Sequence, residues 1–368
     1  MRRGSRTRTN PIVRVLYEGA GLTLDPGLLG MHFHRWPEGD PLSDAPTYGF
    51  GTVRSYDYSG LNNPGLRWNK IHTAADTYNW TSLDVWVNTH YAAGRRLIYT
   101  VYGTPDYLKT SSTLDAYGAP GGASAPSDIA TGSPSLQAFV TALINRYAGK
   151  LYAVEAWNEP NFDQIDGNGF WWGSAQQMVD VTAAVLLGRD ASTDPAVKVL
   201  SPGFVDGAFL PGGRMDTFLA AESGFAPGAF GFDAFEETAI HIYGASYTPL
   251  WPTNRLETSI TNAKAIWARY PALAGRPWHV TEQGMDGSPA SGAWAGLTLA
   301  QKGLTLARNV LVQGVLGAKS VCLYSHDSNW IGDARNAEIA AALDAVHQMA
   351  GQTYTTIALR ADGALVTA

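Results

Sequence analysis

The stretch that decides the fold is Leu151-Tyr-Ala-Val-Glu-Ala-Trp157, a mostly apolar run short enough for one β-strand. A helical pattern over Ser174–Arg189 follows it, and a second apolar run, Val197–Gly203, comes next. Nearly continuous apolar runs are typical of parallel strands that are buried on both faces. A helix between two such strands predicts an α/β protein with a parallel sheet.

The same alternation extends in both directions along the chain. Eight candidate strands cover Leu28–His34, Gly51–Tyr56, Leu97–Gly103, Leu151–Trp157, Val197–Gly203, Ala239–Tyr243, Trp278–Gly284 and Ala318–Ser325. Helical patterns cover Trp80–Ala93, Ser135–Ala148, Ser174–Arg189, Arg214–Glu222, Asn254–Tyr270, Leu297–Gln313 and Arg335–Ala350. Eight strands that alternate with helices predict a (β/α)8 TIM barrel with a single catalytic domain. An open doubly wound sheet is the alternative, and the lack of a glycine-rich phosphate loop after the first strand disfavours it.

Composition excludes several classes of protein. The chain has 368 residues, of which 45% are hydrophobic, 11% aromatic and 16% charged, so it is not a disordered chain. Its length suits one α/β barrel. Cys322 is the only cysteine, which excludes an intrachain disulfide and a cysteine-rich metal site. No apolar run approaches the roughly 20 residues of a membrane span.

Charge is distributed unevenly along the sequence. The net charge is −6, yet residues 1–14 carry five arginines and no acidic residue. The acidic remainder argues against a nucleic-acid partner. We expect residues 1–14 to form a flexible basic arm, residues 15–350 the catalytic barrel, and residues 351–368 a short β-extension packed on it. No signal sequence is visible, and an extracellular or periplasmic location is expected if one was removed.

Two glutamates mark the mouth of the predicted barrel, where the C-terminal ends of the strands carry the chemistry. Glu159 ends the fourth strand in Asn158-Glu159-Pro160, and Glu282 ends the seventh strand. These two strands lie across the mouth from each other in a closed barrel. Glycoside hydrolysis uses two carboxyl groups in one cleft, a protonated one for the leaving oxygen and an ionised one for the anomeric carbon. The pair therefore predicts that chemistry.

Aromatic residues gather in the segments that follow the predicted strands. The candidate sugar-stacking rings are Trp36, Tyr102, Trp171, Trp172, Trp251 and Trp330, with His326 beside the last of them. Aromatic faces stack on sugar rings, so the group favours a carbohydrate cleft. The alternative for any single ring is that it packs a loop onto the barrel.

Histidines on the first strand are further candidates. His32 and His34 have the same parity, so both face one side of the sheet, and one of them is expected to contact the sugar. The alternative is a core histidine bonded to a neighbouring strand. A metal site formed by His32, His34 and His241 is conceivable, but we predict no metal and no other cofactor.

The strand-end motifs resemble those of clan A of the glycoside hydrolases, which are retaining enzymes on (β/α)8 barrels. The chain is most similar to family 39, on the evidence of Asn158-Glu159-Pro160, Glu282, Gly30-Met-His32-Phe-His34, Arg54 and His241-Ile-Tyr243. The resemblance covers the chain from Leu28 to Ala350.

The resemblance implies a role for each matching residue. Glu159 is implied to be the general acid/base, Glu282 the nucleophile, and Asn158 a hydrogen-bond partner of the sugar 2-hydroxyl. Tyr243 is implied to donate a hydrogen bond to Glu282. Arg54 is implied to hold the pKa of Glu282 down by its charge, and His241 to line the cleft near Glu159 or the sugar.

The expected function follows from the resemblance. We predict a monomeric retaining glycoside hydrolase that cleaves β-glycosidic bonds of an oligo- or polysaccharide by double displacement. The chain leaves no room for the accessory β-domain of longer family members, so it looks more like related endo-glycosidases that cut bacterial exopolysaccharides. An exo-acting β-glycosidase such as a β-xylosidase, and a carbohydrate-binding barrel without catalysis, are the alternatives. A lyase or aldolase needs a strand-end lysine or a metal, and the strand-end motifs hold no lysine.

Overall fold

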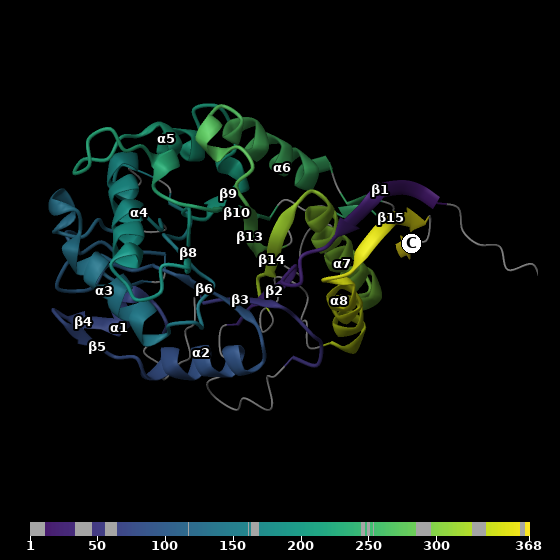
Figure 1. Ribbon diagram of the computed structural model, residues 1–368, viewed down its shortest axis with the longest axis horizontal. Coiled ribbons are helices and arrows are strands. Elements are labelled where there is room, and N and C mark those ends of the chain that lie inside the picture. The colour runs from purple at the N-terminus through teal and green to yellow at the C-terminus, as the bar shows by residue number, and fades with distance from the viewer. Residues whose placement is uncertain are drawn as a thin grey trace, which may run out of the picture.

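The computed structural model describes residues 12–33, 46–55, 65–116, 118–160, 162, 169–243, 247–248, 251–252, 254–284, 296–325, 336–360 and 365–368. A parallel sheet forms the centre of the molecule, and helices surround it (Figure 1). No helix in these ranges is long and apolar enough to cross a membrane.

The central sheet confirms all eight expected strand positions. They are β2 (Leu29–His32), β3 (Thr52–Arg54), β6 (Arg96–Thr100), β7 (Ala153–Glu155), β8 (Lys198–Leu200), β10 (Thr238–Ile242), β13 (Trp278–Gln283) and β14 (Ala318–Leu323). With β9, the order is β8-β7-β6-β3-β2-β14-β13-β10-β9, and every neighbouring pair is parallel. Val53, Val154 and Val280 at the strand centres are fully buried, as a sheet covered on both faces requires.

A ninth short strand closes the sheet into a barrel. β9 (Phe204–Val205) continues the line of β8 after a break at residues 201–203, and it pairs in parallel with β10. A bridge between Leu200 and Glu237, and a 2.9 Å bond from the Ser201 N–H to the Glu237 carbonyl oxygen, join the two edges. The fold is therefore the expected (β/α)8 barrel.

Eight α-helices accompany the strands in the described ranges. They are α1 (Trp68–Ile71), α2 (Thr81–Ala92), α3 (Pro134–Arg146), α4 (Ala175–Asp190), α5 (Arg214–Ala220), α6 (Asn254–Trp267), α7 (Leu299–Val315) and α8 (Ala337–Met349). Helices α4 and α7 begin at capping boxes, in which Ser174 pairs with Gln177 and Thr298 with Gln301. Small antiparallel pairs, β4 (His72–Ala74) with β5 (Thr77–Tyr78) and β11 (Tyr247–Thr248) with β12 (Trp251–Pro252), lie in the connections.

The side chains inside the barrel change from apolar to polar toward the mouth. An apolar cluster on the central strands consists of Ile98, Ala153, Leu200 and Ala239. Side chains two positions further along a strand point to the same side, and three of them are buried and polar: Thr100, Glu155 and His241. The sequence of the strands thus places a charged layer directly above an apolar one.

A three-stranded sheet lies outside the barrel, near α7 and α8 (Figure 1). Within the segment expected to form a C-terminal β-extension, β15 (Thr353–Arg360) and β16 (Leu365–Thr367) run antiparallel. A third strand, β1 (Ile12–Thr23), pairs with β15 and was not expected. The expected arm boundary at Arg14 falls inside β1, where the Arg14 guanidinium lies 2.6 Å from the Glu257 carboxylate of α6.

Candidate active site

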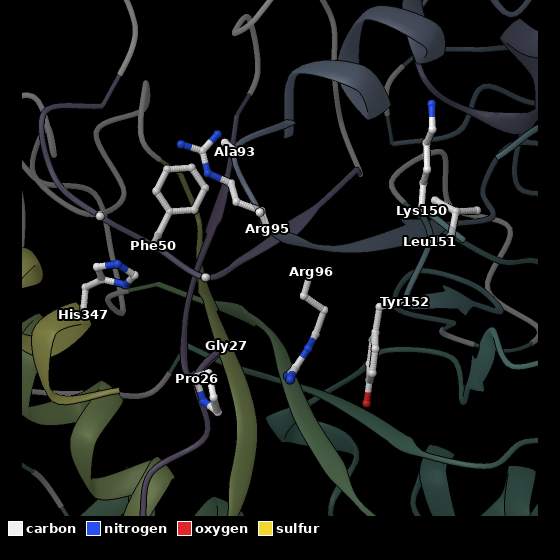
Figure 2. A pocket seen from close by; sticks show the side chains of 13 residues that line it. Pro26, Gly27, Phe50, Ala93, Arg95, Arg96, Lys150, Leu151, Tyr152 and His347 are labelled. Carbon is white, nitrogen blue, oxygen red and sulfur yellow. The ribbon is translucent and has the colours of Figure 1, made fainter. Parts of the chain in front are cut away.

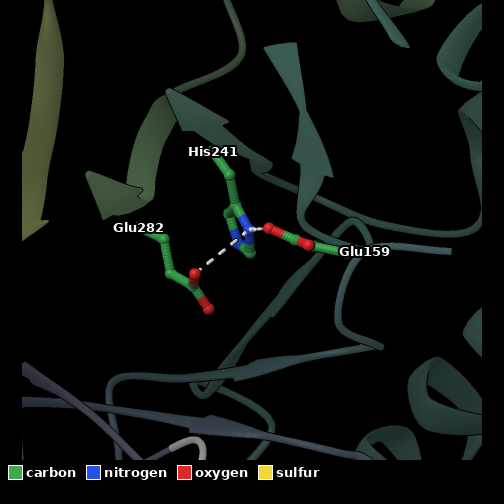
Figure 3. Close-up of side chains that lie close together, drawn as sticks. All are labelled: Glu159, His241 and Glu282. Atoms are coloured by element: carbon green, nitrogen blue, oxygen red, sulfur yellow. Dashed lines mark hydrogen bonds and ion pairs between the residues drawn. The ribbon is translucent and has the colours of Figure 1, made fainter. Parts of the chain in front are cut away.

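The barrel brings the two predicted glutamates together at the C-terminal ends of its strands. Glu282 is the fifth residue of β13, and Glu159 follows β7. Figure 3 shows both carboxyl groups directed toward the ring of His241. One oxygen of each glutamate and a ring nitrogen of His241 all lie within 4.8 Å of one another. The across-the-mouth placement expected from the sequence is therefore observed.

The backbone fixes Glu159 in an uncommon conformation. Its φ is +40°, in the left-handed region that L-residues rarely adopt. The Glu159 N–H donates to the Gly203 carbonyl oxygen at 3.0 Å, and the Gly203 N–H donates to the Trp157 carbonyl oxygen at 2.9 Å. These two bonds hold the turn that directs Glu159 into the cleft. Backbone strain of this kind is concentrated at functional sites.

Glu282 lies in a deeper and more crowded position than Glu159. Its side chain is 5% exposed, against 19% for Glu159. The Arg54 Nη1 atom donates to one Glu282 oxygen at 2.5 Å, and the Tyr243 hydroxyl donates to the other. Burial raises the pKa of Glu282, while the charges of His241 and Arg54 oppose that rise. Arg54 thus lies where we expected and its charge lowers the pKa of Glu282 as expected, but burial outweighs this effect and the net shift is upward.

Arg54 organises this side of the site through its fully buried guanidinium. Its Nε donates to Glu155 at 2.5 Å, and its Nη2 donates to the Asn158 side-chain oxygen at 2.8 Å. Burial opposes the charge of Arg54, but Glu155 and Glu282 outweigh burial and raise its pKa. The planar fork of arginine suits three such acceptors at once. Asn158 is therefore locked next to Glu159 and beside the site, as expected.

His241 bridges the two sides of the site. Its Nδ1 lies 2.8 Å from Glu159 Oε1 and 3.7 Å from Glu282 Oε2. Burial favours the neutral ring, but Glu282, Glu155 and Glu159 together outweigh it and raise the pKa of His241 to about 9. An imidazolium at this place donates its proton toward Glu159 and offsets the charge of Glu282. The expected position of His241 near Glu159 is confirmed.

His32 is a core residue rather than a group that lines the cleft. It is fully buried, and its Nε2 lies 2.8 Å from the Thr281 carbonyl oxygen. A carbonyl only accepts, so Nε2 carries the proton. The ring also meets Tyr324 edge-on at 5.4 Å. The alternative of a histidine bonded to a neighbouring strand therefore describes His32, and the predicted sugar contact of this pair stays a prediction for His34.

Two predicted stacking rings are closed off from any ligand. Tyr102 is fully buried, its hydroxyl donates to Asp115 at 3.0 Å, and its ring packs on Trp157. Trp171 is also fully buried, packs edge-on against Trp157 and donates to the Ser174 carbonyl oxygen at 3.2 Å. Their expected role as sugar platforms is wrong, because these rings instead pack mouth loops onto the barrel. Trp172 is also buried, at 8% exposure.

Several other residues that were predicted at the rim have no described side chain. His34, Trp36, His326 and Trp330 lie outside the described residues. Trp251 is the first residue of β12, and its side chain is not among those described. Sugar contacts by these residues remain predictions.

Sequence reasoning missed the carboxylate at the bottom of the site. Glu155 is fully buried and accepts hydrogen bonds from Thr100 and Thr281, both at 2.6 Å. Burial opposes its ionisation, but the charge of Arg54 and the hydrogen bonds prevail and hold its pKa at about 2. The available signal was a charged residue inside a run predicted to be buried, since such residues are rarely buried without a partner.

Gly203 is a second residue that sequence reasoning missed. A Cβ at this position would lie 2.3 Å from His241 Nε2 and 2.8 Å from Glu155 Oε1. Contacts this close displace one group or the other, so only glycine lets the β8–β9 break pass beside His241. No sequence signal distinguishes this glycine from the 39 others in the chain.

The three-residue cluster around His241 has a spacing that a cation also uses, but its charge disfavours one. Arg54 lies 2.5 Å from Glu282, and a protonated His241 lies between the glutamates. These two buried positive charges repel a further cation at this place. The arrangement is better suited to proton transfer and nucleophilic attack.

A separate cavity of about 580 Å³, whose lining side chains are drawn in Figure 2, lies at the opposite end of the barrel. Gly27, Gly51 and Arg96, at the start of β2, β3 and β6, line it together with His347 of α8. Arg96 is paired with Asp25 at 2.9 Å. The cavity therefore lies at the N-terminal ends of the strands, away from Glu159 and Glu282.

Comparisons with known proteins show which solved structures share this architecture. No family model and no curated protein sequence matches the chain. Among solved structures, a GH39 enzyme from Xanthomonas axonopodis pv. citri matches with a TM-score of 0.64 and 17% identity, over 98% of this chain and 75% of that one. A monomeric β-xylosidase from Caulobacter crescentus CB15 matches with a TM-score of 0.61 and 18% identity, over 95% and 71%.

The chain has the fold of family 39 glycoside hydrolases. A family 39 glycoside hydrolase from Bacteroides cellulosilyticus WH2 matches as well, with a TM-score of 0.61 and 16% identity, over 93% of this chain and 69% of that one. The resemblance drawn from the strand-end motifs is thus confirmed at the level of the fold. At these identities the likeness concerns the family 39 barrel, and activity has to be argued from the site.

Proposed function

We propose that this protein is a retaining glycoside hydrolase that cleaves β-glycosidic bonds by double displacement. The observation that carries the proposal is the pair Glu159 and Glu282, whose nearest oxygens are within 4.8 Å at the mouth of the barrel. Retaining enzymes have carboxyl groups about 5–5.5 Å apart, whereas inverting enzymes leave about 6.5–9.5 Å for a water molecule. The short separation supports retention.

The environments of the two glutamates support different roles. Glu282 is the more buried, and Arg54 and Tyr243 each donate to one of its oxygens, so its carboxylate is held in one orientation. A nucleophile needs this alignment with the anomeric carbon. Glu159 is more exposed, and its side chain bonds to His241 alone among the described residues. A group that exchanges protons with a leaving group and then with water needs such access.

The first step would proceed as follows. A carboxylate oxygen of Glu282 attacks the anomeric carbon, and the bond from that carbon to the leaving oxygen breaks. Glu159 gives its proton to the leaving oxygen, which departs as an alcohol. His241 stabilises the carboxylate that forms on Glu159, because its Nδ1 lies 2.8 Å away.

The second step would reverse these roles. Glu159, now ionised, takes a proton from a water molecule, and the water oxygen attacks the anomeric carbon. The bond between the sugar and Glu282 breaks, and Glu282 returns as a carboxylate. Arg54 and Tyr243 stabilise that negative charge, because each donates a hydrogen bond to one oxygen of Glu282. Two displacements at one carbon return the starting configuration.

We further propose that the substrate is a polysaccharide that is cut internally. The support is the resemblance of the strand-end motifs to those of exopolysaccharide-cleaving endo-glycosidases. Asn158 supports the assignment to sugar chemistry, because Arg54 fixes its oxygen and leaves its amide N–H groups for a sugar hydroxyl.

Release of reducing ends tests the proposal. The wild-type protein is incubated with a panel of bacterial exopolysaccharides and plant β-glycans, with and without EDTA, and the products are sized. We expect short oligosaccharides from at least one polymer, unaffected by EDTA and absent with Glu282→Gln. Single sugars would indicate the exo-acting alternative. Binding without release from any polymer would contradict the proposed activity and favour the binding barrel.

A further inference from the structure

Glu155 is a buried carboxylate that the steps above do not use. It ends β7, four residues before Glu159, and it is fully excluded from solvent. An ion buried without partners costs several kcal/mol. The chain nevertheless keeps a third carboxylate in contact with the groups that surround the two candidate catalytic ones.

The contacts of Glu155 lead to both sides of the site. Its Oε2 accepts from Arg54 Nε at 2.5 Å and from the Thr100 hydroxyl at 2.6 Å. Its Oε1 accepts from the Thr281 hydroxyl at 2.6 Å and lies 3.9 Å from His241 Nε2. One oxygen of Glu155 therefore binds Arg54, and the other faces His241.

His241 lies between two carboxylates. Its Nδ1 faces Glu159 at 2.8 Å, and its Nε2 faces Glu155 at 3.9 Å. The Nε2 atom is buried and has no hydrogen-bond partner within the part of the chain that the structure describes. Gly203 keeps the space beside this nitrogen open to Glu155, because a Cβ there would touch both groups.

We infer that Glu155 is a positioning residue, whose buried negative charge keeps His241 protonated toward Glu159 and holds the guanidinium of Arg54 against Glu282. The inference rests on the proposed function, because it gives Glu155 a part in the two-glutamate site. Glu155 itself touches neither Glu159 nor Glu282 and acts through the two cations.

Charge balance explains why the third carboxylate is needed. The charged and titratable groups that face His241 are Arg54 from β3, Glu155 and Glu159 from β7 and its end, Tyr243 after β10, and Glu282 from β13. When Glu159 carries its acid proton, the two cations are balanced by Glu155 and Glu282. Without Glu155, two buried cations would face one anion. Arginine does not release its proton, so His241 would be the group that loses charge.

The protonation of His241 is measured directly by NMR titration of the histidine rings, with His241→Asn used to assign the signal. In the wild type we expect His241 to titrate near pH 9. In Glu155→Gln the midpoint should fall by about one to three pH units, the range of a nearby-charge effect. A wild-type His241 that is neutral at pH 7 would overturn the inference, even if the variant does not fold.

The pH profile of kcat/KM gives the functional test. Removal of a negative charge lowers every macroscopic pKa of the coupled His241, Glu159 and Glu282 group, so both limbs should move to lower pH in Glu155→Gln. Glu155→Asp keeps the charge and should restore the wild-type limbs. If Glu155→Gln lowers kcat/KM equally at all pH values, the role of Glu155 is purely structural. That result would contradict the inference.

Glu237→Gln is the matched control. Glu237 is also a buried barrel carboxylate, with His279 Nε2 at 2.8 Å and the Tyr152 hydroxyl at 2.7 Å, but it lies at the other end of the barrel. The Glu237→Gln variant should keep both limbs of the kcat/KM pH profile at their wild-type positions. If the wild type cleaves no glycan while His241 shifts in the NMR titration, the placement of charge stands and the proposed activity fails.

Discussion

The hydrogen bond from Tyr243 to Glu282 offers a perturbation whose effect can be worked out in advance. The Tyr243→Phe substitution removes one hydroxyl and keeps the ring, which packs against Gly284 at the end of β13. Arg54 still donates to the other oxygen of Glu282. The variant therefore keeps the fold and the main cation of the site and loses one donor to the candidate nucleophile.

The size of the effect follows from the loss of one hydrogen bond to a charged group, which is worth about 1.5–3 kcal/mol. Because one pKa unit corresponds to about 1.4 kcal/mol, the pKa of Glu282 should rise by about one to two units. Loss of a donor destabilises the ionised form, and burial already favours the neutral form. At a pH below the shifted limb, kcat/KM should fall by about 10- to 100-fold.

The assay is the pH dependence of kcat/KM, whose acid limb reports the carboxylate that must be ionised in the free enzyme. In Tyr243→Phe we expect this limb at higher pH. Tyr270→Phe is the control, because the Tyr270 hydroxyl donates to Asp216 at 2.8 Å far from the site, and Arg269 pairs with the same carboxylate. An acid limb that stays in place while the rate falls would refute the reasoning that Tyr243 acts on Glu282.

Three further predictions concern the same network. Gly203→Ala should displace His241 or Glu155, lower kcat/KM by about tenfold or more, and cost about 1–3 kcal/mol of stability, as measured by urea unfolding. Glu159→Gln should abolish hydrolysis of natural glycans yet still react with aryl glycosides whose leaving group needs no proton; equal loss on both substrates would exclude the acid role. Ionised Glu155 should contribute about 3 kcal/mol of stability above pH 4.5, lost as the pH falls toward about 2, so the stability gap between wild type and Glu155→Gln should close in acid.

The two glutamates at the strand ends could be predicted from the sequence, because each is marked by the apolar run that directly precedes it. Glu159 and Glu282 each follow an apolar run, and the barrel rule then places them at one mouth. Glu155 could not be predicted in the same way, because it lies within the strand and its partners come from β3, β6 and β13. Its role depends on which side chains a closed barrel brings together.

The sugar platforms could not be predicted because burial of loop residues is not a local property. Tyr102 and Trp171 carry the same aromatic signal as exposed stacking residues, yet Trp157 covers both. The strand β1 was missed for a related reason. Its partner strand β15 begins about 330 residues later, where Thr23 pairs with Thr353. A local sequence pattern cannot predict so distant a contact.

The stereochemistry of the product tests the central claim most directly. Proton NMR during the first minutes of hydrolysis, on whichever glycan the wild type cleaves, identifies the anomer that forms before mutarotation. The short separation of Glu159 and Glu282 predicts that the β-anomer appears first, with the configuration of the substrate. First appearance of the α-anomer would contradict the two-glutamate double displacement.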